Sequence, residues 1–289
     1  MPQRFMRYSI VALLIGLTLM PGLPGRAETY LASFDETRAE FLMLQAINQL
    51  RYQHGLPLVV LDDDLSLVSR RHALDMAQRD YFGHFSPEGA SPDDRVHRAG
   101  LPYEVTENIG IIRTSGRDVN RVVDAVMESF LASPSHLANI LDPNVTHVGV
   151  GFYQDVEGGN HRLSGNEDSS AVYTGFGTIL VVQDFCRRNV RILAPSPFYG
   201  QAAEGEFVEL RLDFTDQVLE AFLRIVSQED PGETYEIPLA RDKESYRARF
   251  AIDREGTFTI AIYANTSPDD WFYREQGRLE LTVSPGVSN

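Results

Sequence analysis

Residues 133–152 read SPSHLANILDPNVTHVGVGF and contain the change from helical to strand patterning that decides the fold. The serine and proline that open this stretch predict a helix start, and the Asp-Pro pair at 142–143 predicts its end. After that pair, Val148, Val150 and Phe152 alternate with small or polar residues, which is typical of a strand. A short helix followed by a strand is therefore predicted at this point of the chain.

Helical periodicity dominates the chain before this stretch. Three apolar stripes recur at the spacing of an amphipathic helix, and a shorter helix is predicted from Ser91-Pro92-Asp93-Asp94 to Gly100. The acids at 62–64 suit the start of the second long helix. The stripes are Ala39, Leu42, Met43, Ala46, Ile47 and Leu50; Leu65, Val68, His72, Ala73 and Met76; and Val119, Val122, Val123, Val126, Met127, Phe130 and Leu131.

Strand patterns follow the 133–152 stretch. Residues 171–185 form a β-branched and aromatic run, which we expect to pair antiparallel with the strand at 148–152. A polar surface loop over residues 157–170 is predicted between the two strands. Helices that flank a small sheet form an α+β or α/β sandwich, and this architecture is expected up to about residue 186.

From residue 187 onwards the sequence is rich in strand patterns and contains no good helix. Seven short runs separated by proline and glycine are typical of an all-β, immunoglobulin-like sandwich, predicted here for residues 187–289. The runs are Val190–Leu193, Phe207–Phe214, Ala221–Val226, Tyr235–Leu239, Tyr246–Ala251, Thr257–Tyr263 and Leu279–Val283. They contain no cluster of catalytic residue types, so we expect an adhesion or spacer module that attaches the chain to a surface, glycan or protein.

Length and charge restrict the classes of function. A chain of 289 residues with 43% hydrophobic and 23% charged residues is long enough for about two domains with their own cores. The 41 acidic residues outnumber the 26 basic ones, which gives a formal net charge of −15. Such a surface repels phosphate backbones and anionic headgroups, so nucleic acid is excluded as a leading partner.

The N-terminal 27 residues are typical of a secretory signal peptide. Arg4 and Arg7 precede an apolar run, residues 8–20, and small residues surround Arg26 before a mature chain that would start near Glu28. The alternative is an uncleaved N-terminal anchor. Export predicts a secreted or periplasmic protein without a transmembrane segment in its mature chain.

Only one cysteine occurs, Cys186, so no internal disulfide can form. A buried unpaired thiol is the favoured interpretation, and an intermolecular bridge is the alternative.

Histidines and carboxylates of residues 28–186 are the candidates for chemistry. The chain has no H-E-x-x-H, G-x-S-x-G, P-loop or C-x-x-C motif. His84 follows a helix end and on its own would be a surface or packing histidine. His136 is the third residue of its helix, where the helix dipole disfavours an imidazolium ion. A neutral imidazole with a free nitrogen suits a metal or a proton-accepting site.

Three further residues have simpler interpretations when each is taken alone. Glu107 precedes an apolar run and would be an ordinary exposed acid. Glu128 projects opposite the apolar stripe of its helix, which places it on a solvated face or on a cleft. His72 lies on an apolar stripe, which favours a hydrogen-bonded core histidine.

Several motifs taken in order resemble a known family. They are Met76-Ala77, YFGHFSP at 81–87, Glu107-Asn108-Ile109, SPSHLANIL at 133–141 and HVGVG at 147–151. This order and spacing resemble the bacterial branch of the CAP superfamily, also called SCP/PR-1-like or the cysteine-rich secretory protein family. The resemblance covers about residues 35–185 and none of the tail.

The resemblance implies a three-layer α-β-α sandwich with a large open cleft. It places the family's tetrad of two histidines and two glutamates on His84, Glu107, Glu128 and His136. It also implies that His84 and His136 can hold a divalent metal, often zinc, and that Glu107 and Glu128 are the candidates for any catalytic carboxylate. These carboxylates could orient the imidazole rings or hold a water.

Four positions depart from the family pattern and alter the wall of the cleft. Ser135 replaces a usual glycine, Leu137 a usual arginine, Thr106 a usual glycine and Phe130 a common tryptophan. Ligands known for relatives therefore do not transfer directly to this chain.

Two protein ligands leave open positions on a zinc ion, so weak and pH-dependent binding is expected. This favours a cleft that binds an extracellular ligand, a lipid or small apolar molecule, or a partner protein, over an enzyme. A metal-assisted hydrolase of peptide or phosphodiester bonds is one alternative. A structural envelope protein with a vestigial site is another. A Ser133 or Ser135 nucleophile is disfavoured, because a capping serine uses its hydroxyl on backbone N–H groups.

Overall fold

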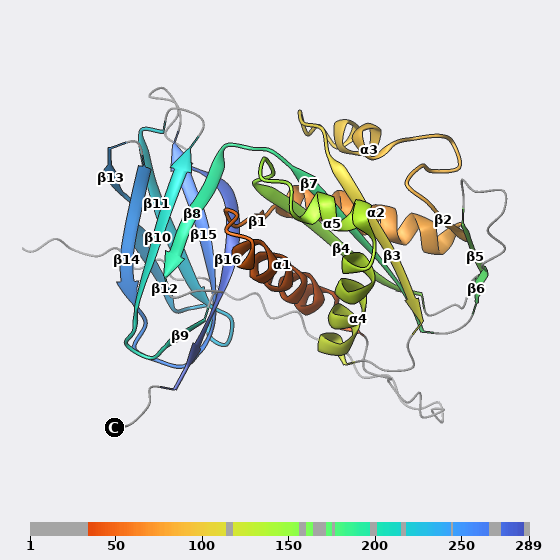
Figure 1. The fold of residues 1–289 in the computed structure, drawn as a ribbon. Helices are drawn as coiled ribbons and strands as arrows, with labels where there is room; N and C mark the ends of the chain where they lie inside the picture. The colour runs from red at the N-terminus through yellow and green to blue at the C-terminus, as the bar shows by residue number, and fades with distance from the viewer. Residues whose placement is uncertain are drawn as a thin grey trace, which may run out of the picture. The chain divides into compact units, whose positions relative to one another are not determined.

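The computed structural model describes residues 34–113, 118–155, 160–163, 172–174, 177–196, 201–214, 218–243, 245–265 and 273–285 (Figure 1). The predicted signal peptide, residues 1–27, lies outside these ranges, as does most of the predicted loop at 157–170. In the ranges described, no helix combines the length and the apolar character needed to cross a membrane.

Helices and strands alternate up to Cys186, and strands alone follow. The helices are α1 (Glu36–Gln53), α2 (Asp63–Gln78), α3 (Pro92–Arg98), α4 (Val119–Leu131) and α5 (Pro134–Ile140). The strands are β1 (Val60–Leu61), β2 (Tyr81–Phe82), β3 (Thr106–Arg113), β4 (His147–Asp155), β5 (Asn160–Leu163), β6 (Val172–Thr174), β7 (Thr178–Cys186), β8 (Val190–Ser196), β9 (Gln201–Ala203), β10 (Phe207–Phe214), β11 (Glu220–Ser227), β12 (Thr234–Pro238), β13 (Ala240–Asp242), β14 (Ser245–Ala251), β15 (Gly256–Asn265) and β16 (Arg274–Ser284).

The helices α1 to α4 begin after residues whose side chains accept hydrogen bonds from the backbone of the first turn. Asp62 accepts from the backbone N–H of Leu65 at 3.0 Å, and Ser91 forms a reciprocal capping box with Asp94 ahead of α3. All five helices predicted from periodicity and capping are confirmed. Local chemistry is therefore enough to place them.

Helices cover both faces of the sheet formed by β1, β4, β7 and β3 (Figure 1). Along β7, Ile179 and Val181 pack into the core shared with α1 and α4, whereas Leu180 and Val182 pack with residues of α2. Because successive side chains of a strand point to opposite faces, one strand supplies both layers. The predicted antiparallel pairing of β4 with β7 and the α/β class are confirmed.

The tail forms two groups of strands around a second apolar core. One sheet has the order β13-β14-β10-β8, and β12, β11, β15 and β16 lie side by side in the other. All seven predicted strands are present, whereas β9 and β13, each of three residues, were not predicted. The tail is therefore rich in β structure, as expected.

The last strand joins the sheet of the first part of the chain. β16 pairs antiparallel with β1, with Leu61 opposite Arg278, while β1 pairs in parallel with β4 on its other side. Arg278 also forms an ion pair with Asp63 at 2.7 Å. Arg38 of α1 reaches Glu280 of β16 at 2.7 Å, although the two lie 242 positions apart. The sequence patterns gave no sign of this pairing.

Cys186 is buried and unpaired at the end of β7, which confirms the favoured interpretation of the single cysteine. Burial, with the charge of Asp62 nearby, raises the pKa of its thiol far above the usual value. The thiol therefore stays protonated and unreactive at neutral pH.

His147 makes the stability of the fold sensitive to acid. The ring is wholly buried, with Nε2 2.6 Å from the carbonyl oxygen of Gln276 and Nδ1 2.8 Å from the hydroxyl of Thr146. Burial, followed by the charge of Arg188, lowers the pKa of His147 to about 4 from the ordinary 6.5. The folded state thus holds a neutral ring, and acid favours the unfolded chain, whose histidine binds the proton.

We expect this stabilisation to be complete above pH 6.5 and to be lost as the pH falls from 6.5 towards 4, by at most about 3 kcal/mol. Urea unfolding at several pH values tests this. His147→Gln should be less stable than the parent at pH 7 but should lose less stability on acidification. Identical pH slopes for the two proteins would contradict the assignment.

Candidate functional site

Glu107 lies at the centre of the predicted site. It is the second residue of β3, opposite Asp184 of β7, and exposes only 7% of its surface. The expectation of an ordinary exposed acid is therefore wrong for Glu107. The side chain is buried because the loop after β2 and helix α3 cover this end of β3, so its charge needs partners inside the protein.

Arg95 of α3 supplies the main positive partner of Glu107. Its Nη2 atom forms an ion pair with Oε2 of Glu107, and its Nη1 atom donates to the carbonyl oxygens of His84 at 2.8 Å and Ala90 at 3.2 Å. One guanidinium group thus neutralises the buried carboxylate and fixes the loop that carries His84. No sequence motif pointed to Arg95.

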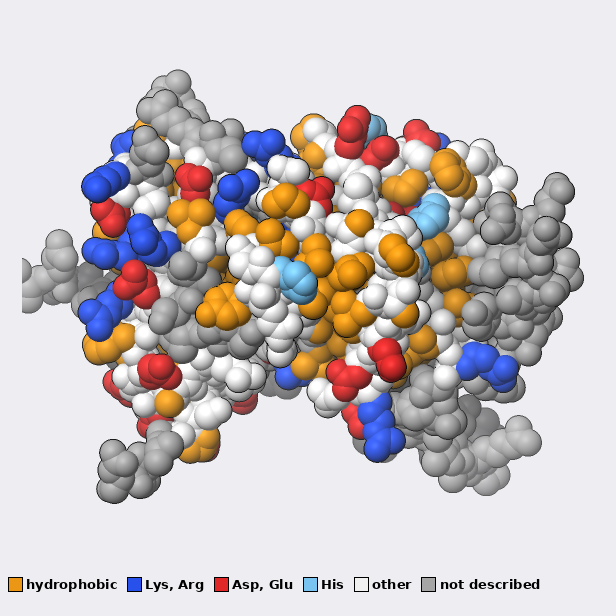
Figure 2. All heavy atoms as spheres, in the orientation of Figure 1, with side chains coloured by type: hydrophobic (Ala, Val, Ile, Leu, Met, Phe, Trp, Pro, Cys, Tyr) orange, Lys and Arg blue, Asp and Glu red, His pale blue; other side chains and the backbone are white. Residues whose placement is uncertain are grey.

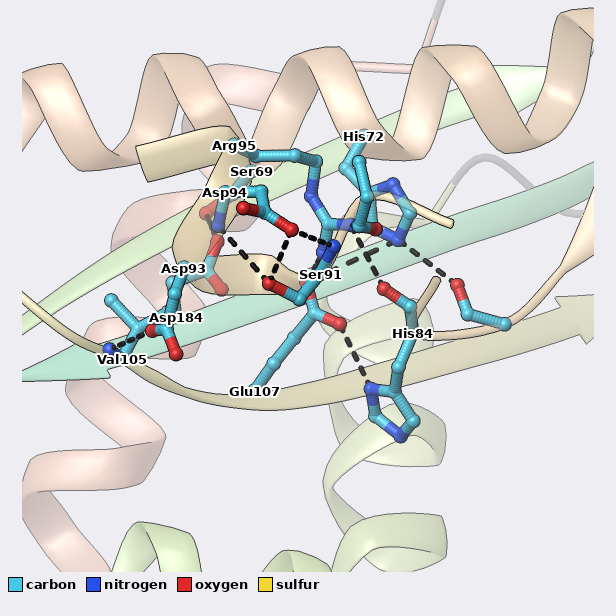
Figure 3. Close-up of polar contacts among 12 residues, drawn as sticks. Ser69, His72, His84, Ser91, Asp93, Asp94, Arg95, Val105, Glu107 and Asp184 are labelled. Atoms are coloured by element: carbon cyan, nitrogen blue, oxygen red, sulfur yellow. Dashed lines mark hydrogen bonds and ion pairs between the residues drawn. The ribbon is translucent and has the colours of Figure 1, made fainter. Parts of the chain in front are cut away.

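His84 is oriented by the other oxygen of Glu107. Its Nδ1 atom lies 2.8 Å from Oε1 of Glu107, while its side chain is 44% exposed (Figure 3). A carboxylate that accepts from one ring nitrogen fixes the tautomer and leaves the second nitrogen free for a metal or a proton. The figure shows Arg95 and His84 approaching Glu107 from two directions.

His136 lies in the first turn of α5 and packs edge-on against Phe130, with ring centroids 5.0 Å apart. Its Nδ1 atom is buried and has no hydrogen-bond partner among the described residues. Burial, and then the charge of His84, lower the pKa of His136. The prediction of a neutral imidazole is supported, although the causes are burial and a second histidine instead of the helix dipole.

Amide side chains hold α5 against β3. Asn108 donates from Nδ2 to the carbonyl oxygen of His136 at 3.1 Å and to Oε1 of Gln183 at 3.1 Å. Asn139 donates to Oδ1 of Asn108 at 2.8 Å. These bonds fix the backbone of His136 relative to the strand that carries Glu107. The Glu-Asn and His-x-x-Asn spacings were quoted for the resemblance, but their amides were not assigned a role.

Asp184 is a buried acid that the sequence interpretation missed. It is 1% exposed, and its Oδ2 atom accepts from the hydroxyl of Ser69 at 2.6 Å. Burial and the neighbouring charge of Glu107 raise its pKa well above the usual value. The raised pKa favours the protonated form of Asp184, beside the ion pair that Glu107 makes with Arg95. Asp184 lies opposite Glu107 because of the register between β3 and β7, which sequence patterns do not define.

His72 is a core histidine, as predicted. It is 1% exposed, its Nε2 atom lies 3.1 Å from the carbonyl oxygen of Gly83, and burial lowers its pKa to about 4. Its ring is close to the site, with Nε2 4.0 Å from Oε2 of Glu107. A neutral ring at this position supports the loop before His84 without adding charge.

The structure relates three of the four tetrad residues by described interactions. His84 contacts Glu107, and its charge acts on His136. Glu128 is exposed on α4, and no described interaction joins it to the other three. In the part of the chain that the structure covers, no group of three His, Cys, Asp or Glu side chains is placed to hold a metal ion.

Ser133 does not cap α5 as expected. It occupies the position before the helix, but its hydroxyl makes no bond to the helix backbone and lies 3.2 Å from the hydroxyl of Ser135. The reason is that the two hydroxyls bond to each other. The argument that capping occupies the Ser133 hydroxyl is therefore wrong, although neither serine contacts a described histidine nitrogen.

Comparison with known proteins agrees with the family that the order of motifs indicated. The sequence profile of the CAP, or cysteine-rich secretory protein, family matches residues 44–182. These residues form a CAP domain. The matched residues include most of α1 and all of α2 to α5. They contain the loop with His84, the strand β3 with Glu107 and the helix α5 with His136.

Two curated relatives of the CAP domain come from Bacillus subtilis (strain 168). The uncharacterized protein YkwD is 31% identical over 115 residues, which are 39% of this chain and 41% of YkwD. The uncharacterized membrane protein YlbC is 30% identical over 117 residues, which are 40% of this chain and 32% of YlbC. The chain thus spans about two fifths of the length of YkwD and about one third of the length of YlbC.

Two solved structures show limited similarity. An extracellular protein containing a SCP domain from Bacillus anthracis str. Ames is 24% identical, with a TM-score of 0.38, over 53% of this chain and 41% of that chain. An outer surface protein from Borrelia burgdorferi is 21% identical, with a TM-score of 0.37, over 52% of this chain and 93% of that chain.

Proposed function

We propose that the CAP domain is an extracytoplasmic ligand-binding module whose site contains His84 and His136. The supporting observation is the contact of Nδ1 of His84 with the buried carboxylate of Glu107 at 2.8 Å. This contact directs the second ring nitrogen of His84 away from Glu107, as in the carboxylate–histidine pairs of metal sites. The unpaired Nδ1 atom of His136 adds a neutral imidazole beside it.

The donor set favours a weakly held divalent ion, zinc foremost. Two imidazoles fit zinc chemistry, but Glu107 is already bonded to Arg95 and His84, and Glu128 has no described link to them. Catalytic zinc sites usually have three protein ligands. A bound ion would act here as a Lewis acid with coordination positions left for water or an outside ligand. The two histidines would hold it, and Glu107 would orient His84.

Apolar side chains near the site favour a lipid or small apolar molecule with a polar end. Phe85 follows His84 directly and is 59% exposed, and Leu131 at the end of α4 is 41% exposed. Figure 2 shows hydrophobic side chains gathered over the face that carries α1, α4 and α5. Exposed apolar surface of this kind is typical of binding sites.

Zinc titration calorimetry of the full chain tests the metal part of this proposal. We expect one weak site in the parent and at least about a tenfold loss of affinity in His84→Ala and in His136→Ala. His97→Ala is the matched control, because His97 is exposed on α3 and does not contact the site. Equal uptake by all four proteins would contradict the metal site.

The affinity should also depend on pH. Metal and protons compete for the imidazole nitrogens, so zinc should leave as the pH falls. Because the pKa of His136 is lowered, this residue should resist protonation to a lower pH than a free histidine. The affinity should be measured at pH 7.5 and at pH 5.5, because the ordinary pKa of an imidazole, roughly 6.5, lies between these two values. A zinc affinity that is the same at both would contradict this prediction.

We further propose that residues 187–289 form an immunoglobulin-like β-sandwich that attaches the CAP domain, residues 28–186, to a surface. The two strand groups around an apolar core support this. Release of residues 1–27 on export is part of the same proposal. N-terminal sequencing of protein recovered outside the cytoplasm tests it, and an intact Met1 would count against cleavage.

A further inference from the structure

A pocket lies between α2, α3 and the loop that joins β2 to α3. Its volume is about 370 Å³, which is within the usual range of small-molecule sites. None of its lining residues is His84, Glu107, Glu128 or His136. The pocket is therefore distinct from the site that contains His84, although Arg95 contributes to both.

Positive charge dominates the lining of this pocket. Four arginines line it, Arg71, Arg79, Arg95 and Arg98, against the acids Asp75 and Glu88. The sign of this local charge is opposite to that of the whole chain, which has 41 acidic and 26 basic residues. His72, which also lines the pocket, is neutral because burial lowers its pKa.

Two of the four arginines, Arg79 and Arg95, form ion pairs with other described residues. Arg79 is paired with Glu88 and with Asp75, and Arg95 is paired with Glu107.

The side chains of Arg71 and Arg98 are exposed. Among the described residues, neither guanidinium group has an ion-pair or hydrogen-bond partner. Two hydrogen bonds from Ser91 lower the pKa of the Asp94 carboxyl group, and the charge of Arg98 adds to this shift. Two guanidinium groups, one on α2 and one on α3, thus remain available to a ligand.

The rest of the lining suits the body of a small organic molecule. Val68, Ala90 and Ala99 provide apolar surface, and Ser86 provides a hydroxyl. Guanidinium groups bind carboxylates and phosphates in a two-point geometry, which Lys cannot reproduce. We propose that this pocket binds a small organic oxyanion, a phosphate monoester or a carboxylate, with Arg71 and Arg98 as its charge partners.

The test is calorimetric titration of the full chain with phenyl phosphate and, separately, with benzoate, in low salt with EDTA present. EDTA removes any metal, so the result does not depend on the His84 site. We expect saturable binding of at least one of the two anions, weakened by added salt. The tighter anion identifies the oxyanion as phosphate or carboxylate. Benzyl alcohol, which has a similar ring but no charge, should bind much more weakly.

Substitutions then locate the site. Arg71→Ala/Arg98→Ala should weaken binding by about tenfold for each arginine that contacts the anion. Arg113→Ala/Arg187→Ala is the matched control, because these arginines are exposed, lie outside the pocket and remove the same charge. Both variants should keep the parent unfolding midpoint. The proposal is wrong if neither anion binds or if benzyl alcohol binds as tightly as the anions. It is also wrong if the two double variants lose the same anion affinity.

Discussion

Gly151→Ala is expected to cost about 5 kcal/mol of unfolding free energy, the largest effect that we expect. A Cβ atom at this position of β4 would lie 2.2 Å from the backbone nitrogen of Arg70 and 2.4 Å from the carbonyl carbon of Ser69. Both atoms belong to the main chain of α2, so no side-chain rotation can relieve the clash. Overpacking usually costs about 1–3 kcal/mol, and the backbone neighbours, which cannot move aside, place this substitution above that range.

Urea denaturation followed by circular dichroism measures this effect. Gly232→Ala is the control, because a Cβ atom there would meet only the side-chain oxygen of Asp230 at 3.3 Å, in an exposed turn. That variant should unfold close to the parent midpoint. A Gly151→Ala protein with the parent midpoint would show that α2 does not pack this closely on β4.

Arg51→Leu should cost about 4 kcal/mol of unfolding free energy, the second largest effect we expect. Arg51 is wholly buried in α1 and is bonded to carbonyl oxygens. Nε donates to Pro57 at 2.8 Å, Nη1 to Ile140 and Asp142 at 2.8 Å each, and Nη2 to Val145 at 3.3 Å. Leucine would fill part of the space but leave these carbonyls without donors, and unpaired buried acceptors are costly.

Arg51→Leu should also weaken metal binding at the candidate site. Ile140 ends α5, and Asp142 and Val145 lie between α5 and β4, so Arg51 fixes the end of the helix that contains His136. We therefore expect weaker zinc uptake as well as lower stability. Arg121→Leu is the control, because Arg121 is 88% exposed and meets only Asp118 at 3.5 Å. Its effect should stay within about 0.5 kcal/mol, and equal losses in both variants would contradict the role of Arg51.

The helices were predictable because their determinants are local. Apolar residues at helical spacing and capping residues such as Asp62 and Ser91 lie within a few positions of the backbone that they organise. Strands of three residues, β9 and β13, are too short for a pattern to appear. The pairing of β1 with β16 depends on contacts between distant segments, which periodicity does not encode.

The site was only partly predictable. The order of motifs linked His84, Glu107 and His136, and the structure relates them by contact or charge. The burial of Glu107 was not predicted, because it depends on Arg95, which lies twelve positions earlier on another element and matches no motif. The pairing of Glu107 with Asp184 depends on strand register, which becomes visible only when β3 and β7 are aligned.

The attachment of β16 to β1 has a consequence for biogenesis. During synthesis or translocation the N-terminal segments emerge first, yet the edge of β1 gains its partner only when the strand around Arg278 has followed. Until then that edge is an open template for another chain, and closing so long a loop slows folding. A holding chaperone would therefore help most while the last strand is still inside the ribosome or the translocon.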